Sequence, residues 1–260
     1  MNSFLLHALH LARLISISTV IFLIIFINLV TSISASESTF SVIQKQELNQ
    51  LIEQYLNENP EVIVKAIQQM QERQSREDAA RSAEALKKNK KELLTDQDAP
   101  VIGNLRAKVT VVEFFDYRCG YCKRAFNIMM KVLKENPDIR YVLKELPILG
   151  PDSINATRAS LAIWRTQQDK YLAFHSALMK ARGGIPESKI FNIAAEIGID
   201  IVKLKKDMAD PKIDQILEKN FQLAQALNIT GTPAFIIGDQ IIPGAIDEAT
   251  MKKMIAATDG

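Results

Sequence analysis

The sequence predicts an α/β fold that follows a separate helical region. Two apolar, β-like runs flank a helical pattern between residues 109 and 146, which is the order of a parallel strand–helix–strand unit. A long helical stretch covers about residues 153–228, and the pattern then changes to a β-hairpin and a last helix. We therefore expect one mixed sheet with helices packed on it and a helical insertion before its last strands.

The first 35 residues have the pattern of an export signal. One cation, Arg13, precedes an uncharged apolar run from Leu14 to Val30, and the small residues Ser32-Ile33-Ser34-Ala35 follow. The run is slightly short for a membrane-spanning helix, so we expect a signal peptide over residues 1–35, with an uncleaved membrane anchor as the alternative. Either interpretation places the rest of the chain in the periplasm or otherwise outside the cytoplasm, where disulfides can persist.

Residues 36–95 are predicted to form a helical oligomerisation or stalk region. Two apolar stripes at helical spacing occur there, from Leu48 to Leu56 and from Val62 to Met70, with Asn59-Pro60 between them as an N-cap and first helical residue. The polar stretch that follows can be a solvated helix or a semi-rigid spacer. Two small amphipathic helices cannot bury their stripes alone. We expect a homo-oligomer through residues 40–70, or else helices folded back on the main domain.

Residues 96–146 are predicted to contain a loop, a strand, a helix and a second strand. The loop covers residues 96–108, the strands are Val109–Phe115 and residues 139–146, and the helix is Cys119–Asn136. Glu113 interrupts the first apolar run. A carboxylate in a buried strand costs free energy unless it is paired or protonated. Glu113 is therefore a candidate proton acceptor for Cys122, or it marks a strand end with access to water.

Five helices are predicted within residues 153–228. Ser153 is expected to cap the first of them and Asp200 the fourth. His175 lies on an apolar helix face, where we expect a packed core residue and not a catalytic one. After these helices, Gly238-Asp239 predicts the two-residue turn of a hairpin.

The only two cysteines of the chain, Cys119 and Cys122, lie between a predicted strand and a predicted helix. In that context Cys-x-x-Cys is typical of a redox motif. The first helical turn leaves backbone N–H groups unpaired and its dipole favours negative charge, so a thiolate at Cys119 is stabilised there. The neighbouring cation Arg118 is expected to act in the same direction. Cys122 lies one turn further, within reach of a disulfide formed at Cys119.

Other uses of the two thiols compete with redox exchange. Zinc needs about four ligands, and outside the signal segment only His175 accompanies the cysteines. A structural disulfide across one helical turn closes a very short loop and stabilises little. Two thiolates can hold Cu(I), which leaves a non-catalytic copper-binding or surface protein as an alternative. Thiol exchange itself needs no metal or organic cofactor.

The charge of the chain is almost balanced, with 32 basic and 30 acidic residues and a formal net charge of +2. A nucleic-acid-binding chain usually carries a basic excess or basic blocks. We therefore expect no nucleic-acid partner.

Three segments carry a resemblance to a known family. They are residues 113–122, the loop of residues 146–151 (Leu-Pro-Ile-Leu-Gly-Pro) and residues 231–235 (Gly-Thr-Pro-Ala-Phe). By these segments the chain resembles the DsbA family of exported thiol–disulfide oxidoreductases over roughly residues 96–260. The resemblance implies a thioredoxin fold with an inserted helical subdomain. The N-terminal region is similar to the oligomerisation segment of DsbA-like proteins of the suppressor-of-copper-sensitivity type.

The resemblance also implies roles for single residues. It assigns catalysis to Cys119, Cys122 and Glu113, and substrate binding to Thr232, Pro233 and Tyr121. Cys119 would be the exposed nucleophile and Cys122 the resolving thiol, and Glu113 matches the family's buried acid. Pro233 would be a cis-proline facing the cysteines, and Thr232 would offer backbone hydrogen bonds to an extended substrate peptide.

One departure from the family concerns the dipeptide between the cysteines. The strongly oxidising members carry Pro-His there, whereas this chain carries Gly120-Tyr121 and so lacks a histidine that helps to stabilise the thiolate. The activity stays open between an oxidase that introduces disulfides and an oligomeric isomerase or reductase. The expected partners are exported proteins with cysteines, a membrane redox partner and further copies of the chain.

Overall fold

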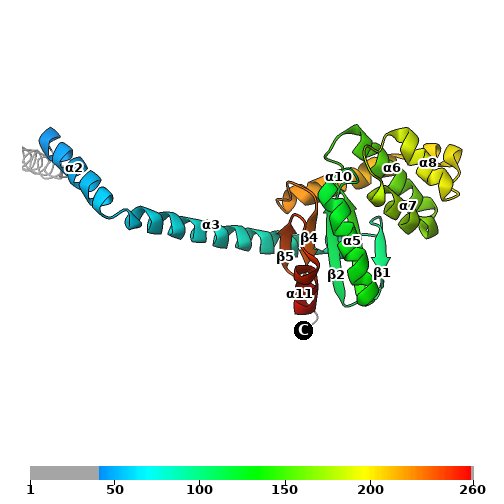
Figure 1. The fold of residues 1–260 in the computed structure, drawn as a ribbon, viewed down its shortest axis with the longest axis horizontal. Helices are drawn as coiled ribbons and strands as arrows, with labels where there is room; N and C mark the ends of the chain where they lie inside the picture. The colour runs from blue at the N-terminus through cyan, green and yellow to red at the C-terminus, as the bar shows by residue number, and fades with distance from the viewer. Residues whose placement is uncertain (1–40, 259–260) are drawn as a thin grey trace, which may run out of the picture. The chain divides into compact units, whose positions relative to one another are not determined.

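The computed structural model describes residues 41–258, so the predicted signal peptide at residues 1–35 lies outside the described residues. Within residues 41–258, no helix is long and apolar enough to cross a membrane. The chain divides into two units, one up to Gln69 and one from Met70. The helices before the sheet are α2 (Val42–Glu58), α3 (Glu61–Lys88) and α4 (Lys90–Leu94) (Figure 1).

The two long N-terminal helices confirm the predicted helical region but not its predicted cap. Ser41 opens α2 with a capping box, in which its side chain and that of Gln44 each accept the other residue's backbone N–H. Asn59 was predicted to be an N-cap, which is wrong. Its side-chain amide donates to the carbonyl of Tyr55 at 2.9 Å, so it closes α2 as a C-cap. The polar stretch after Met70 contains no Gly or Pro and continues as one helix to Lys88.

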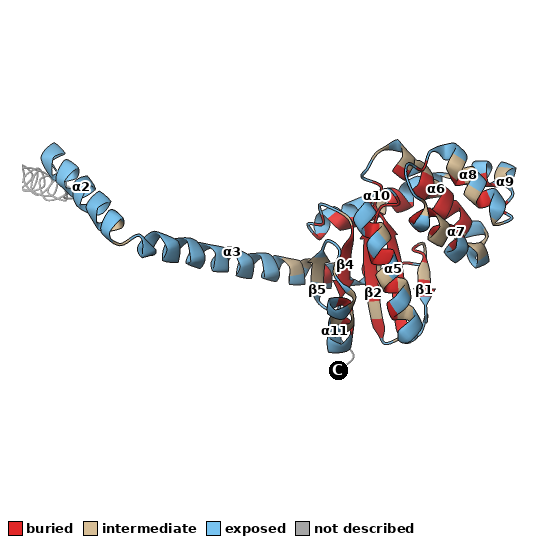
Figure 2. Cartoon of the chain, in the orientation of Figure 1, coloured by how far each residue is buried: buried red, intermediate tan, exposed pale blue. Residues whose placement is uncertain are grey.

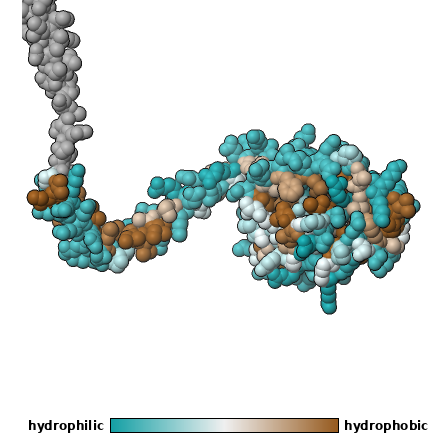
Figure 3. All heavy atoms as spheres, turned by 90° about the horizontal axis from the view of Figure 1, so that it is seen from above, coloured by the Kyte–Doolittle hydropathy of each residue, from teal (hydrophilic) through white to brown (hydrophobic). Residues whose placement is uncertain are grey.

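The apolar stripes of this region are exposed. Within residues 41–258, no side chain of α2 is buried, and the start of α3 is exposed as well (Figures 2 and 3). The exposed large apolar residues of the two predicted stripes are Leu48, Leu51, Ile52, Tyr55, Val62, Ile63, Ile67 and Met70, and Val42, Ile43 and Val64 of the same helices are exposed too. The helices α2 and α3 therefore do not bury these stripes by themselves.

Five strands form one mixed sheet in the order β1-β3-β2-β4-β5. Their bounds are β1 Val101–Gly103, β2 Val109–Phe115, β3 Ile139–Glu145, β4 Ala234–Ile237 and β5 Gln240–Pro243. β2 and β3 are parallel and are joined by α5 (Gly120–Glu135), which confirms the predicted crossover unit. β4 pairs antiparallel with both β2 and β5, so the predicted hairpin is confirmed too.

The prediction of a loop over residues 96–108 is wrong in its middle. Val101–Gly103 forms β1, which pairs antiparallel with Arg140–Val142 of β3. A three-residue strand at a sheet edge is too short to show an alternating pattern, so tertiary pairing alone determines it.

Alternate residues of β2 enter two cores on opposite faces of the sheet. Val111 and Phe115 belong to the core that contains α5 and the inserted helices. Val112 and Phe114 belong to a smaller core on the other face of the sheet. This core also contains Leu86 of α3 and residues of α10 (Pro211–Ala226), the last helix of the insertion. By this alternation Glu113 points to the same face as α5.

The helical insertion confirms the five predicted helices. They are α6 (Pro151–Thr166), α7 (Gln168–Lys180), α8 (Glu187–Glu196), α9 (Ile201–Met208) and α10, and the last helix of the chain is α11 (Glu248–Thr258). Asp200 caps α9 as predicted, because its carboxylate accepts the N–H groups of Val202 and Lys203. The predicted cap at Ser153 is wrong. α6 already begins at Pro151, and the Ser153 hydroxyl donates to Asp116 instead.

Candidate active site

Cys119 lies where β2 leads into α5. It is the N-cap of α5, and its Sγ accepts the backbone N–H of Cys122 at 3.4 Å. Cys119 keeps 7% of its surface exposed, whereas Cys122 keeps none. Cys119 is thus the accessible thiol of the pair, but only through a small opening, and it is less exposed than the family resemblance implied.

The two thiols are held in opposite protonation states. The hydrogen bond with the Cys122 thiol lowers the pKa of Cys119 from 9.0 to about 5, and the backbone N–H of Cys122, Thr232 and the backbone N–H of Tyr121 act in the same direction against burial. Burial raises the pKa of Cys122 far above its ordinary value, and its hydrogen bond to Cys119 and the charge of Glu113 add to this rise. At neutral pH the pair is therefore a thiolate at Cys119 and a thiol at Cys122.

The expected help from Arg118 is not what lowers this pKa most. The main causes are the hydrogen bonds to Cys119 from its neighbours in α5 and from Thr232. The Arg118 guanidinium instead donates to the carbonyl of Leu149. Arg118 therefore ties the loop after β3 to the active-site loop.

Thr232 and Pro233 lie opposite the cysteines, as the resemblance implied. The peptide bond between them is cis. The carbonyl oxygen of Thr232 is 3.2 Å from Cys119 Sγ, and the thiol form of Cys119 donates to it. The loop before β4 and the start of α5 thus meet at the nucleophilic sulfur.

Glu113 lies in the middle of β2, between Leu143 of β3 and Phe235 of β4. It is 1% exposed, so the alternative of a strand end with access to water is wrong. Within the part of the chain that the structure describes, its Oε1 has no hydrogen-bond partner. Burial raises the pKa of Glu113 well above its usual range, and the negative charge of Cys119 adds to the rise. Burial and the nearby thiolate therefore both favour the neutral form of the Glu113 carboxyl over its carboxylate.

Two buried side chains hold the loop before Cys119, and the sequence did not identify either of them. Asp116 accepts the N–H of Arg118 at 2.7 Å, the N–H of Leu149 at 3.0 Å and the hydroxyl of Ser153 at 2.8 Å. The hydroxyl of Tyr117 lies 2.6 Å from Ser160 Oγ. A polar residue directly between a buried strand and the cysteines was the one available sign of the role of Asp116.

His175 is a buried residue of α7, as predicted. Its Nδ1 lies 2.8 Å from the hydroxyl of Tyr117, and its ring packs against Phe115, Phe126 and Tyr171. Burial lowers the pKa of His175 to about 3, so the ring is neutral at physiological pH. The imidazole therefore supports the loop below the cysteines and does not reach them.

Tyr121 lies on the first turn of α5, between the cysteines in sequence. It is 59% exposed, and the Arg124 guanidinium lies 4.4 Å above its ring. The ring is thus held at the surface by a cation–π contact.

In the described residues, no group of three or more His, Cys, Asp or Glu side chains is arranged to hold a metal ion.

A Cys-x-x-Cys pair at a helix start, facing a cis-proline on a thioredoxin-like sheet, defines a thiol–disulfide oxidoreductase. A family model for the DSBA-like thioredoxin domain matches residues 110–256. The chain therefore belongs to the DsbA-like family of thiol–disulfide oxidoreductases.

Known proteins similar to the chain agree with this assignment. Disulfide bond formation protein D of Bacillus subtilis is 28% identical over 167 residues, which are 60% of this chain and 75% of that protein. A thioredoxin-like oxidoreductase from Silicibacter pomeroyi has 40% identity and a TM-score of 0.63, and the match covers 66% of this chain and 98% of that one. The match also extends to Na(+)/H(+) antiporters, of whose length it covers only 21% to 26%.

Two further solved structures show how far the similarity reaches. ScsC of Proteus mirabilis has 30% identity and a TM-score of 0.64, and the match covers 84% of this chain and 98% of that one. A periplasmic thioredoxin-like protein of Salmonella enterica serovar Typhimurium has 34% identity and a TM-score of 0.61, and covers 65% of this chain and 94% of that one. The match to ScsC extends beyond the part of the chain that the family model covers.

Proposed function

We propose that the chain is an exported enzyme that rearranges disulfides in other exported proteins, as an oligomer assembled through residues 40–70. The observation that carries the proposal is the asymmetry of the cysteine pair. Cys119 is accessible and its pKa is lowered to about 5, whereas Cys122 is fully buried with a raised pKa. Such a pair presents one nucleophilic thiolate to substrates and keeps the second thiol in reserve.

Rearrangement begins with the Cys119 thiolate attacking one sulfur of a wrong disulfide in the substrate. The Cys119–substrate bond forms, the substrate disulfide breaks, and its other sulfur leaves as a thiolate. A substrate thiolate then attacks the substrate sulfur of the mixed disulfide, which forms a new substrate disulfide and releases Cys119. No net oxidation occurs, and release is fast because a thiol of low pKa is a good leaving group.

Cys122 and Glu113 resolve a mixed disulfide that does not rearrange. Cys122 attacks Cys119 Sγ, the Cys119–Cys122 disulfide forms, and the substrate leaves as a thiolate. Glu113, in its ionised form, takes the proton of Cys122. In the mixed disulfide the negative charge of Cys119 is gone, so one of the two causes that raise the pKa of Glu113 is removed. Glu113 thus becomes a better proton acceptor at the step that needs one. A membrane redox partner would then reduce the pair again.

Thr232, Pro233 and Tyr121 position the substrate in this proposal. The Thr232 backbone lies against Cys119 Sγ, so an extended peptide paired with it brings its cysteine to the nucleophile. Tyr121 offers an exposed aromatic face next to the opening at Cys119. A Tyr121→Ala variant that bound and exchanged peptides as the wild type does would remove this residue from the substrate site.

The oligomer is proposed from the exposed apolar side chains of α2 and the start of α3. Complete burial of one such side chain contributes roughly 1.5–3 kcal/mol. Six of them would contribute about 9–18 kcal/mol, which is comparable to the cost of association of about 4–15 kcal/mol. Burial of most of both stripes is therefore needed for a stable assembly.

Light scattering tests the assembly. Leu51→Asp together with Ile52→Asp should reduce the molar mass to that of a single chain. Val202→Asp is the matched control, since Val202 is an apolar residue of α9 that is 81% exposed. An unchanged mass in the double variant would remove residues 40–70 as the interface.

An oxidase is the second candidate, and the low pKa of Cys119 favours it. A stabilised thiolate stabilises the reduced pair and so makes its disulfide more oxidising. Equilibration of the pair with glutathione separates the two functions. A potential near about −120 mV would support a disulfide donor, and one near about −270 mV would support an isomerase or reductase that is kept reduced.

A further inference from the structure

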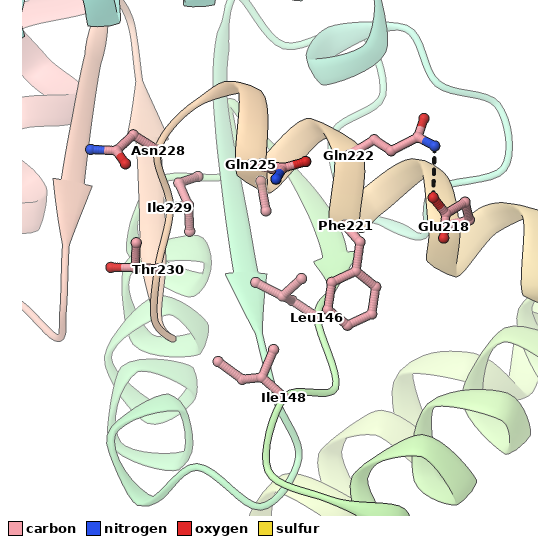
Figure 4. A pocket seen from close by; sticks show the side chains of 10 residues that line it. Leu146, Ile148, Glu218, Phe221, Gln222, Gln225, Asn228, Ile229 and Thr230 are labelled. Carbon is pink, nitrogen blue, oxygen red and sulfur yellow. Dashed lines mark hydrogen bonds between the residues drawn. The ribbon is translucent and has the colours of Figure 1, made fainter.

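A pocket of about 360 Å³ lies between the loop after β3 and the segment that leads from α10 to the cis-proline (Figure 4). We propose that this pocket binds a large apolar side chain of the substrate polypeptide, about two to four residues from the reacting cysteine. The inference rests on the proposed exchange function and adds a sequence preference to it. Its apolar walls are formed by Leu146, Ile148, Phe221, Ala224 and Ile229.

The walls of the pocket are apolar and incompletely covered. Leu146 is buried at its base, whereas Ile148 and Phe221 are each 40% exposed. Figure 4 shows these three side chains pointing toward one another from the loop and from α10. Their exposed surface would leave water if an aliphatic or aromatic side chain entered between them.

The rim of the pocket explains why the occupant should be a peptide. Gln222, Gln225 and Asn228 lie around the apolar walls and offer amide groups that can hydrogen-bond a peptide backbone. Glu218 is the only charged residue of the lining, and its carboxylate accepts the side chain of Gln222 at 2.7 Å. The pocket thus offers no cation for an acidic group, which favours an uncharged side chain.

Two segments connect the pocket with Cys119. On one side, Ile148 is followed by Leu149, whose carbonyl accepts the Arg118 guanidinium and whose N–H donates to Asp116. On the other side, Thr230 is two residues before Thr232, whose carbonyl is 3.2 Å from Cys119 Sγ. Two residues of extended chain span roughly 7 Å, so a peptide that reacts at Cys119 reaches the pocket within a few residues.

The segment between the pocket and the cysteine has free backbone groups. Within residues 41–258, the N–H groups of Thr230, Gly231 and Thr232 make no hydrogen bond to a backbone carbonyl. An extended peptide can pair with such a segment by strand addition. A second depression continues along the same residues from Asn228 to Pro233. The peptide's path from Cys119 along this segment ends at the apolar pocket.

Exchange rates with a set of peptides test the proposal on the full mature chain. Each peptide carries one cysteine in a mixed disulfide with glutathione, and leucine replaces alanine at one position from one to five residues on either side. For the wild type we expect a rate about tenfold higher with leucine at one position two to four residues from the cysteine. Phe221→Ser and Ile148→Ser should each abolish that preference, and Val202→Ser should keep it.

Glutathione disulfide, which is too small to reach the pocket, reports on the chemistry alone. It should react equally with the wild type and with the Phe221 and Ile148 variants. Equal rates for all peptides, or a preference that survives in both active variants, would overturn the pocket while leaving the exchange function intact. No reaction with glutathione disulfide in the wild type would overturn the proposed function and the pocket together. Phe221→Trp fills the pocket and should also abolish the preference for leucine. This variant keeps the test decisive if a serine variant does not fold.

Discussion

Reduction of the Cys119–Cys122 pair should stabilise the protein against unfolding, increasingly as the pH rises from about 5 to about 9. The pKa of Cys119 is about 5 in the folded reduced protein, against an ordinary value of 9.0 in the unfolded chain. Below pH 5 both states bind the proton and the group contributes nothing. Between the two values only the folded state has lost it, so each pH unit adds about 1.4 kcal/mol.

At pH 7 the folded pKa has been passed by about two units, which corresponds to about 2.7 kcal/mol. The Cys119 sulfur lies at a helix end with some solvent access. Screening by solvent and salt can therefore reduce this stabilisation to roughly half of its full value. At pH 7 the lowered pKa of Cys119 should thus make the reduced protein about 1.3–2.7 kcal/mol more stable against unfolding than it would be if Cys119 kept its ordinary pKa. In redox terms this is about 30–60 mV toward an oxidising pair.

Urea unfolding of the reduced and the oxidised protein at acid, neutral and alkaline pH measures this contribution. The informative quantity is the difference in unfolding free energy between the reduced and the oxidised protein, followed as a function of pH. Other titrating groups contribute to both proteins and cancel in this difference. The ultraviolet absorbance of the thiolate gives the midpoint directly. Cys122→Ala removes the largest cause of the low pKa and should raise the midpoint by about one unit or more. A midpoint near the ordinary value, or a stability difference independent of pH, would refute the reasoning.

Three further predictions concern buried ionisable side chains. Glu113→Gln removes the proton acceptor of Cys122, so decay of a mixed disulfide should slow by about a hundredfold in rapid-quench experiments, and an unchanged rate would exclude this role. Burial raises the pKa of Glu145 to about 8, so the wild type should lose stability as the pH rises from about 4.5 to about 8. Glu145→Gln should remove a slope of about 1.4 kcal/mol per pH unit in urea unfolding, and a persisting slope would point to other groups. The Lys144 ammonium is buried and is paired with Asp96 at 2.5 Å, so Asp96→Ala should cost about 3–5 kcal/mol. Adding Lys144→Met should recover part of that loss, and no recovery would contradict an unpaired buried charge as the cause.

The sequence predicted those parts of the fold that local patterns determine. The order β2, α5, β3 followed from a change of hydrophobic period at Cys119 and a proline after α5. β1 was missed because three residues carry no period, and its pairing with β3 depends on residues far along the chain. Asn59 was assigned to the wrong helix because its side chain can serve either end, and only its hydrogen bond to Tyr55 decides between them.

The candidate site was predicted only as far as its chemistry is local. A Cys-x-x-Cys pair and an acid inside an apolar strand are visible in one segment, and so was the low pKa at a helix start. The supports of the active-site loop were not, because Asp116 binds Ser153 and Tyr117 binds Ser160 and His175, which lie 37, 43 and 58 positions away. The cis bond at Pro233 was implied by family resemblance alone, since about 5–6% of X–Pro bonds are cis.

These supports give the helical insertion a part in setting the reactivity of Cys119. The loop before Cys119 receives five hydrogen bonds through Asp116 and Tyr117, each contributing roughly 1 kcal/mol net. Because His175 is neutral, its Nδ1 can accept the Tyr117 hydroxyl, which leaves the Ser160 hydroxyl to donate to Tyr117. A loop that loosened here would shift the N-cap sulfur away from the thiol and the backbone N–H of Cys122, whose hydrogen bonds stabilise the thiolate. The inserted helices thus help to maintain the low pKa of a cysteine that none of these side chains touches.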